Sequence, residues 1–314
     1  MTSRRRSPVP EELVGGIGVD VGGSGSRATA FEVGEAGLLR ATGGRECEHQ
    51  GRLSRGLLKL IVETREQEAG ISGPVGIAAP GRKTGDGRGI EYARNLEACP
   101  HLLDELRDGA PADLDLPDTL ASDAEAALVG ETVIEGGLLR GESSALLVAP
   151  GSGIAEAWLW CGEVRPIEGV RAWDLPPIRE DDGVTDLERE GALLGLFGRW
   201  SGDQPLEQAV AEGDAGAVAA LERFASALAR LVDERGAELS ALAREGGRPP
   251  AVLVRTRRGD LLHQAAVRAC VRPALQASVR RHGGRLVLPE APASRYAACA
   301  GALALRTVGR RARS

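Results

Sequence analysis

The sequence predicts an α/β protein built from two lobes. At 314 residues the chain is long enough for two domains, which commonly span about 100–200 residues each. Short apolar segments with strand-like alternation are followed by segments with helical spacing, as in α/β proteins. A strand, a glycine–hydroxyl turn and a second strand occur twice, in residues 16–32 and 145–160. Two such hairpins, one at the start of each lobe, would converge on one cleft.

Composition indicates a globular protein, with 42% hydrophobic and 27% charged residues. No apolar run approaches the roughly 20 residues needed to cross a bilayer, and residues 1–12 form a basic tail without the apolar core of a signal peptide. We therefore expect a cytoplasmic protein with a disordered tail and no membrane partner. The five cysteines are scattered without a Cys-x-x-Cys pair, which indicates neither a disulfide framework nor a zinc knuckle.

The charge balance argues against a nucleic-acid partner. The formal net charge is −6, whereas nucleic-acid-binding domains are usually basic. Aromatic residues make up only 3% of the chain, and the basic tail is too short for a helix-turn-helix module. Lysine occurs only at Lys59 and Lys83, a bias that we attribute to genome composition and not to function.

The first hairpin has the features of a phosphate-binding turn. Ile17, Val19 and Val21 alternate as a buried strand does, and Asp20 lies on that strand just before the turn. Glycines let backbone N–H groups approach an anion, hydroxyls add donors, and a carboxylate beside a polyphosphate typically serves hydrated Mg²⁺. The residues that would face the anion are Gly22, Gly23, Ser24 and Ser26. The alternative is an ordinary glycine-rich hairpin with a surface aspartate.

Further elements of the first half follow in order. We expect a third strand at residues 38–42, a helix from Leu53 that ends at Gly70, and a buried strand at residues 75–79 that Pro80 stops. An exposed glycine-rich loop at residues 82–88 comes next. The remaining expected elements are a helix at 101–107, a linker at 111–117, a strand at 119–121 and a helix at 124–135, which places Asp123 at a helix N-terminus.

The second half repeats this alternation. An apolar strand at residues 145–149 stops at Pro150, and a strand at 154–160 follows the glycine–serine turn. A long helix at 215–239 carries apolar side chains on one face, as a core helix does. The remaining expected elements are a strand at 251–254, a helix at 261–275, a strand at 285–288 and an alanine-rich helix at 294–305.

Taken in order, four motifs resemble the ROK family of sugar kinases, within the actin-like ATPase superfamily. They are residues 19–24, Pro80-Gly81 with Asn95-Leu96, residues 122–127 with Gly130-Glu131, and residues 151–154. The resemblance implies an α/β, two-lobed actin-like ATPase (ribonuclease H-like) fold with an interlobe cleft. It implies an N-terminal lobe at 13–122, a C-terminal lobe at 123–293, and a terminal helix at 294–314 that packs back on the N-terminal lobe.

The resemblance also implies roles for individual residues. Asp123 would be the base that takes the proton of the attacking sugar hydroxyl, although a helix N-cap is the simpler role for this residue. Asn95 would bind sugar hydroxyls, although it also fits a turn asparagine. Asp20 would hold Mg²⁺ through water. The β- and γ-phosphates of ATP would lie on Gly151, Ser152 and Gly153, together with the first turn.

Three departures from the family pattern stand out. The glutamate–histidine sugar element is reduced to Glu168, without a histidine. The cysteine-rich zinc loop is missing, so we expect no zinc. The adenosine turn is replaced by residues 255–260, an arginine-rich run that would grip a phosphate, fill the nucleotide site or simply be solvated. Glu156 in the second hairpin is also unusual, and it would either replace the lost histidine as a sugar contact or face solvent.

These observations favour ATP-dependent phosphorylation of a sugar hydroxyl, with Mg²⁺ as the cofactor. One alternative is a catalytically degenerate protein that binds a sugar or a nucleotide and acts as a regulator. Another is an activator ATPase of the 2-hydroxyacyl-CoA dehydratase type, but the cysteine placement gives it little support. The sequence leaves open the sugar, the hydroxyl that is phosphorylated, and whether the chain forms a homodimer as relatives often do.

Overall fold

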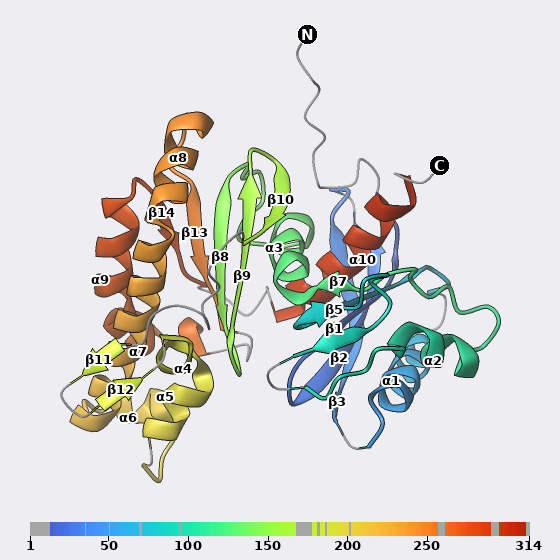
Figure 1. Cartoon of the computed structure of the whole chain (residues 1–314), viewed down its shortest axis with the longest axis horizontal. Helices are drawn as coiled ribbons and strands as arrows, with labels where there is room; N and C mark the ends of the chain where they lie inside the picture. Colours follow the sequence, from blue (N-terminus) through green and yellow to red (C-terminus); the bar gives the residue numbers. More distant parts are fainter. Residues whose placement is uncertain are drawn as a thin grey trace. The chain divides into compact units, whose positions relative to one another are not determined.

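The computed structural model divides the chain into two compact units (Figure 1). One comprises residues 1–140 and 296–314, and the other comprises residues 141–295. The predicted boundary after residue 122 is therefore too early, because the helix that follows it packs within the first unit. The described residues are 13–34, 36–49, 51–68, 71–93, 96–167, 178–180, 183–185, 187–200, 202–256, 261–289 and 295–311.

A five-stranded mixed sheet forms the centre of the first unit, in the order β3-β2-β1-β4-β7. The pairs β1–β2 and β2–β3 are antiparallel, and β1–β4 and β4–β7 are parallel. The third strand is longer than the predicted residues 38–42. The strands are β1 (Gly16–Val21), β2 (Gly25–Val33), β3 (Leu39–Glu48), β4 (Val75–Ala79) and β7 (Ala121–Ser122), with a separate hairpin of β5 (Arg82–Lys83) and β6 (Ile90–Tyr92).

The two faces of this sheet are covered by different kinds of side chain. Ile17, Val19 and Ile77 pack with the apolar residues of α1 (Leu53–Gln67) and α2 (Leu102–Gly109). Strand residues alternate between faces, so the intervening glycines and alanines lie on the other face. That face is covered by α3 (Asp123–Val133) and α10 (Ala297–Arg311).

Glycine makes the approach of α10 possible. A Cβ atom at Gly18 of β1 would lie 1.9 Å from the Cys299 carbonyl oxygen, and one at Gly130 of α3 would lie 1.6 Å from that of Ala297. A Cβ at Gly301 of α10 would lie 1.7 Å from the carbonyl oxygen of Ala126. The terminal helix is therefore packed backbone against backbone on both β1 and α3.

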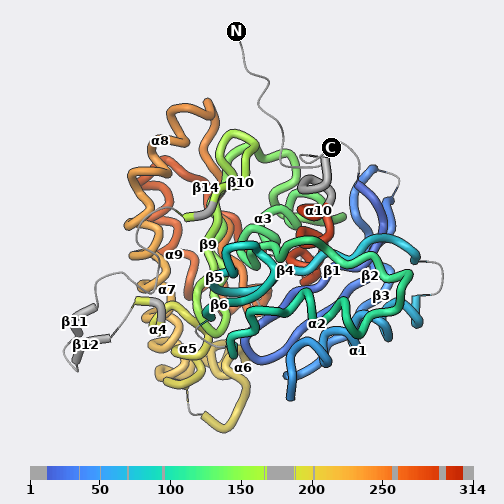
Figure 2. Tube along the Cα trace, turned by 45° about the vertical axis from the view of Figure 1, so that its right-hand side comes forward, coloured from blue at the N-terminus to red at the C-terminus, as the bar shows by residue number. Residues whose placement is uncertain are grey.

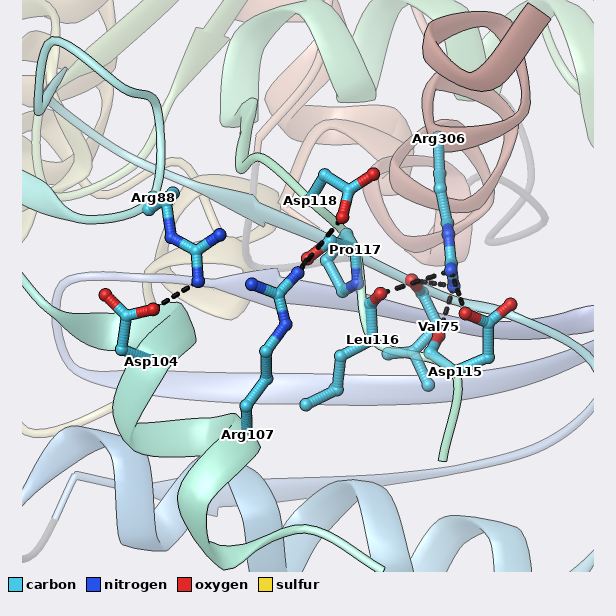
Figure 3. A network of polar contacts seen from close by, with 9 residues as sticks. All are labelled: Val75, Arg88, Asp104, Arg107, Asp115, Leu116, Pro117, Asp118 and Arg306. Carbon is cyan, nitrogen blue, oxygen red and sulfur yellow. Dashed lines mark hydrogen bonds and ion pairs between the residues drawn. The ribbon is translucent and has the colours of Figure 1, made fainter. Parts of the chain in front are cut away.

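Arg306 fixes the other end of this contact (Figure 3). Its side chain is only 5% exposed, and it donates hydrogen bonds to the carbonyl oxygens of Val75, Asp115 and Leu116. It also pairs with the Asp115 carboxylate at 2.5 Å. These bonds tie the later turns of α10 to the beginning of β4 and to the linker before β7.

The second unit contains a sheet with the same pairing scheme, in the order β10-β9-β8-β13-β14. Again two antiparallel pairs are followed by two parallel pairs. Its strands are β8 (Ala145–Pro150), β9 (Ile154–Trp160), β10 (Glu163–Pro166), β13 (Ala251–Val254) and β14 (Arg285–Val287), with β11 (Ile178–Glu180) and β12 (Gly183–Thr185) forming a separate pair.

Long helices with large apolar side chains cover this sheet. Phe224 and Leu228 of α7 and Val271 of α9 belong to one core with Val148 and Val252 of the strands. The predicted helix at 215–239 is two helices, because the chain leaves helical geometry at Arg235. The helices are α4 (Leu187–Gly191), α5 (Leu193–Arg199), α6 (Leu206–Ala211), α7 (Ala215–Glu234), α8 (Gly236–Gly246) and α9 (Ala265–Arg281), with a 3₁₀ turn at Leu261–His263.

Candidate functional site

The first candidate site lies at the edge of the first unit's sheet where its parallel strands end. The sheet register places Asp20 of β1 beside Ala78 of β4, and Ala78 beside Ala121 of β7. The Gly22 turn and Asp123 come directly after these positions, so both lie at the carboxyl edge. Because neighbouring strands are about 4.8 Å apart, β1 and β7 are separated by roughly 10 Å.

The tip of the first hairpin is a narrow backbone turn. The Gly22 N–H donates to the Gly25 carbonyl at 2.9 Å. A Cβ atom at Gly22 would lie 2.8 Å from the same oxygen, so the turn has no room for a side chain there. Ser24 is exposed. The Gly22 N–H is thus used within the turn, and an anion contact from the backbone of Gly23 and Ser24 stays a prediction.

Ser26 has a different environment from the one expected. It pairs with Val21 in the register, and Val21 faces α1 and α2, whereas Asp20 faces α10. Its hydroxyl is 2.8 Å from Nε2 of His49, and the residue is 3% exposed. The prediction that the Ser26 hydroxyl contacts a phosphate is therefore wrong. The hydroxyl instead bonds to His49 on the α1 and α2 side of the sheet.

His49 was missed by the sequence reasoning. It follows β3 directly, and its N–H donates to the Ser24 carbonyl at 3.4 Å while its ring reaches Ser26. Burial lowers the pKa of the His49 imidazole, so the ring is neutral at pH 7 and adds no charge beneath the turn. Its connection to the turn becomes visible only when β2 and β3 are aligned, because residues 26 and 49 are far apart in the chain.

Asp20 begins a row of charged residues across three strands. Asp20 pairs with Arg27 of β2, and Arg27 pairs with Glu46 of β3. The Arg27 guanidinium donates to Glu46 at 2.8 Å and lies 5.8 Å from the centre of the Tyr296 ring. Burial, with the charge of Asp20, raises the pKa of the nearby Cys299 thiol to about 12, so this thiol is protonated at neutral pH.

This donor set fits Mg²⁺ and does not fit a metal held by many protein ligands. Mg²⁺ keeps several of its waters and commonly uses one or two carboxylates together with substrate phosphates. Asp20 supplies one half-buried carboxylate beside the glycine turn. Within the described part of the chain, no three His, Cys, Asp or Glu side chains are grouped so that they could hold a metal ion.

Asp123 is the first residue of α3 and not its N-cap. The N-cap is Ser122, whose side chain makes no capping hydrogen bond. Oδ1 of Asp123 accepts a hydrogen bond from the Ala124 N–H at 2.9 Å. Asp123 is thus an acidic residue in the first turn, at the positive end of the helix dipole. The carboxylate is thus tied to its own helix at the edge where the first hairpin also ends.

The second hairpin repeats the backbone of the first. The Gly151 N–H donates to the Gly153 carbonyl at 2.7 Å, and Ser152 is exposed. The Gly151 carbonyl accepts the N–H of Leu193 at the start of α5 at 2.8 Å. This turn therefore has the geometry that the sequence predicts, but Ala149 occupies the position that corresponds to Asp20.

The residues after β13 are buried, contrary to the expectation of a solvated charge run. Arg255 is 5% exposed and Thr256 is 4% exposed. The Arg255 N–H donates to the Val148 carbonyl at 3.1 Å, which continues the β8–β13 pairing beyond the strand. The arginine-rich turn therefore begins inside the second unit, and residues 257–260 lie outside the described residues.

Glu156 is part of a buried ion pair, so the prediction that it contacts a sugar is wrong. Its Oε1 accepts from Nε of Arg235 at 2.9 Å, and its Oε2 accepts from Nη2 of Arg235 at 3.1 Å. Both side chains are 5% exposed. Glu156 pairs with Val148 in the register, and Val148 belongs to the core beneath α7. It neither faces solvent nor offers an uncommitted carboxylate oxygen to a sugar.

Two predicted sugar contacts, Asn95 and Glu168, lie outside the described residues. The neighbouring Pro80–Gly81 turn is described, and Gly81 has φ of 78°, a left-handed conformation that favours glycine.

No described helix is both long enough and apolar enough to cross a bilayer.

Comparison with solved structures gives strong matches. A ROK family glucokinase from Streptomyces griseus, in complex with glucose and AMPPNP, superposes with a TM-score of 0.65 and 21% identity, covering 92% of this chain and 98% of the other. A ROK hexokinase from Thermus thermophilus gives a TM-score of 0.63 and 19% identity over 95% of this chain and 100% of the other. No protein-family model matches the sequence, and a search of curated proteins gives no match.

A third matched structure is described as a transcriptional regulator and not as a kinase. A ROK family transcriptional regulator, a homologue of the E. coli MLC protein, gives a TM-score of 0.62 and 15% identity, covering 95% of this chain and 80% of the other. The chain therefore has the two-lobed, actin-like ATPase fold of ROK sugar kinases and of this regulator. At these identities the likeness establishes the fold.

Proposed function

We propose that this protein is an ATP-dependent sugar kinase that transfers the γ-phosphoryl group to a sugar hydroxyl. The observation that carries the proposal is the position of Asp123 at the carboxyl edge of the sheet, two strands from the Gly22 turn. A fold that includes glucose- and AMPPNP-bound glucokinase supports the same activity. ATP and Mg²⁺ would be required, and zinc would not.

Phosphoryl transfer depends mainly on positioning and charge neutralisation, so few groups are needed. Asp123 would accept the proton of the attacking hydroxyl while the sugar oxygen bonds to the γ-phosphorus and ADP leaves. Backbone donors at Gly23 and Ser24, and at residues 152–153, would hold the phosphates. The N–H groups of Gly22 and Gly151 would instead shape the two turns, because each donates to a carbonyl within its own turn. Asp20 would orient the water shell of Mg²⁺, which neutralises phosphate charge when it is bound.

Asn95 and Glu168 remain proposed sugar contacts. ATP and reduced thiols are both typical of the cytoplasm, so we also place the protein there. The sugar, the hydroxyl that is phosphorylated and the oligomeric state are parts of the proposal that need assay.

A ligand-binding regulator is the second candidate. The regulator among the matched structures shows that this fold is not confined to kinases. Arg255 and Thr256, buried where an adenosine turn is expected, favour this alternative. The activator-ATPase alternative gains no comparable support, because the described cysteines are unpaired and dispersed over both units.

An Asp123→Asn variant tests the proposal against this alternative. ADP release would be measured over a panel of hexoses and N-acetylhexosamines, with sugar and Mg·ATP binding followed by calorimetry. We expect turnover to fall by about 10³-fold, the range for loss of a general base, while sugar binding is nearly unchanged. Asp118→Asn is the matched control, because Asp118 is 61% exposed and pairs with Arg107 at 3.2 Å.

Two outcomes would contradict the proposal. If Asp123→Asn retains most of the wild-type rate, another group is the base. If the wild-type protein binds a sugar or Mg·ATP but releases ADP with no member of the panel, the regulator is the better description.

A further inference from the structure

Lys83 of β5 makes an unusual set of contacts at the end of β4. Its Nζ donates to the carbonyl oxygens of Ala79 at 2.7 Å, Pro80 at 3.3 Å and Gly81 at 3.1 Å. Three consecutive carbonyl groups therefore converge on one ammonium. Figure 2 shows the β5–β6 hairpin after β4 in the first unit.

The choice of lysine at this position has a chemical reason. An ammonium is compact and has three donors arranged about one point, which suits three converging oxygens. A guanidinium is planar and directs its donors in a fixed fork. The chain has 39 basic residues and uses lysine only at Lys59 and Lys83. Genome composition accounts for the abundance of arginine, but the carbonyl geometry accounts for a lysine at position 83.

The turn that Lys83 holds lies in the candidate site. Ala79 pairs with Ser122, so the turn after Ala79 lies beside the start of α3 and Asp123. On its other side, β1 ends at the first glycine turn. Outward carbonyl oxygens at this edge would repel the phosphates of ATP, and the ammonium offsets their negative ends. The chain thus keeps a positive charge where an anion is expected.

Gly81 is exposed, but the turn is tightly packed on the side where a Cβ atom of Gly81 would project. A Cβ atom at Gly81 would lie 2.1 Å from the Tyr92 carbonyl oxygen and 2.7 Å from the Ala93 Cβ. β5 and β6 pair through Arg82 and Tyr92, which returns the chain over the turn. Removal of the ammonium should therefore leave the carbonyl oxygens close together, because contact with β6 restrains the turn on that side.

We propose that these three carbonyl groups form a monovalent-cation site that the protein fills with its own Lys83 ammonium. This tethered cation positions the Pro80–Gly81 turn for catalysis. The catalytic part rests on the proposed kinase function, whereas the cation site does not. A small cation of similar size, such as ammonium or potassium, should occupy the site when the lysine side chain is removed.

Chemical rescue of Lys83→Ala tests the site directly. The probe is ammonium chloride, compared at equal ionic strength with tetramethylammonium chloride, whose cation is too large for three converging oxygens. We expect ammonium, and not tetramethylammonium, to raise the thermal unfolding midpoint of Lys83→Ala. The kinase kcat/KM should fall about tenfold on loss of the charge-assisted hydrogen bonds and recover with ammonium.

Two further variants serve as controls. Lys83→Arg keeps the charge but not the tetrahedral donors, so neither salt should improve it. Lys59→Ala removes the other lysine, which is 75% exposed and lies 3.8 Å from Glu63, and should respond to both salts as the wild-type protein does.

The outcomes separate this inference from the proposed function. If ammonium stabilises Lys83→Ala no more than tetramethylammonium does, the cation site is disproved, whether or not the wild-type protein is a kinase. If the ammonium effect is present but no sugar is phosphorylated, the site stands and the kinase proposal fails.

If Lys83→Ala does not fold, NMR of the Lys59→Arg protein labelled with ¹⁵N-lysine tests whether the Lys83 ammonium is held in the site. The single remaining lysine should show slowly exchanging Nζ protons. An ammonium signal that exchanges as in solvent overturns the proposal.

Discussion

The two units share a strand order but differ in what lies behind their hairpins. In the first unit the face behind the Gly22 turn carries Asp20, and glycines at positions such as Gly18 bring α10 against the strand. In the second unit Ala149 replaces the aspartate, and a buried Glu156–Arg235 pair lies among large apolar side chains. The same glycine-turn hairpin thus occurs with different side chains behind it in the two units.

This difference has a direct functional reading. The two glycine turns are alike, but only the first has a carboxylate two residues before its first glycine, at Asp20, where the second has Ala149. Under the proposed function, metal-linked charge neutralisation would fall to the first hairpin, and backbone phosphate contacts alone to the second. The carboxylate of the second hairpin, Glu156, is used to hold the unit together.

The buried pair gives the largest expected effect on stability. Glu156→Ala leaves the Arg235 guanidinium buried without its carboxylate, which typically costs about 3–5 kcal/mol. The measurement is urea unfolding followed by tryptophan fluorescence. All four tryptophans of the chain lie within residues 141–295, so this signal reports on the second unit.

The double variant Glu156→Met with Arg235→Met is the control for this prediction. Replacing both charges by apolar side chains removes the need for pairing, so its stability should be close to that of the wild-type protein. A loss below about 1 kcal/mol in the single variant would show that the other interactions of Arg235 compensate for the missing carboxylate.

The sequence predicts the features that depend on neighbouring residues. It does not predict those that depend on contacts between distant segments. Both glycine turns and the placement of Asp123 at a helix start follow from adjacent residues, because turn and helix signals are short-range. The orientation of Glu156 depends on the β8–β9 register and on a partner 79 residues away. Local alternation alone does not say which face of β9 is covered by α7.

Two other differences have the same origin. Ser26 is read as a phosphate donor from its place in the turn motif, but pairing with β3 brings His49 beneath it. The unit boundary is placed after residue 122 by the family resemblance, whereas the return of α10 to α3 assigns the helix at residue 123 to the first unit. In each case a long-range contact outweighs the local signal.

The glycine-lined contact of the first unit gives an effect of intermediate size. Gly130→Ala places a methyl group against the Ala297 carbonyl of α10, which forces the two helices apart. Overpacking of this kind typically costs about 1–3 kcal/mol. Far-ultraviolet circular dichroism should show this loss, and tryptophan fluorescence should show less of it if the units unfold separately.

Gly56→Ala in α1 is the matched control. A Cβ atom there would meet nothing within 4 Å, so alanine should stabilise the helix by up to about 1 kcal/mol. If both alanine variants change stability alike, helix propensity and not close packing explains the glycine at position 130.

The smallest expected effect concerns the outer contact of the second unit, between α7 and α9. Burial acts to raise the pKa of Asp233, but hydrogen bonds from Ser278, His282 and Arg281 outweigh it and hold the pKa below its ordinary value. The carboxylate therefore stabilises the folded state above the unfolded pKa of about 3.9, and this contribution is lost as pH falls through the lower folded value. Because its side chain is 35% exposed, we expect less than about 1 kcal/mol after screening.

Urea unfolding of the wild-type protein and Asp233→Asn between pH 7 and pH 3, followed by tryptophan fluorescence, measures this effect. The stability difference between the two proteins should be constant at neutral pH and should shrink only below about pH 4, where the wild-type carboxylate is protonated. A difference that instead changes well above pH 4 would show that a group other than Asp233 governs the pH dependence of this contact.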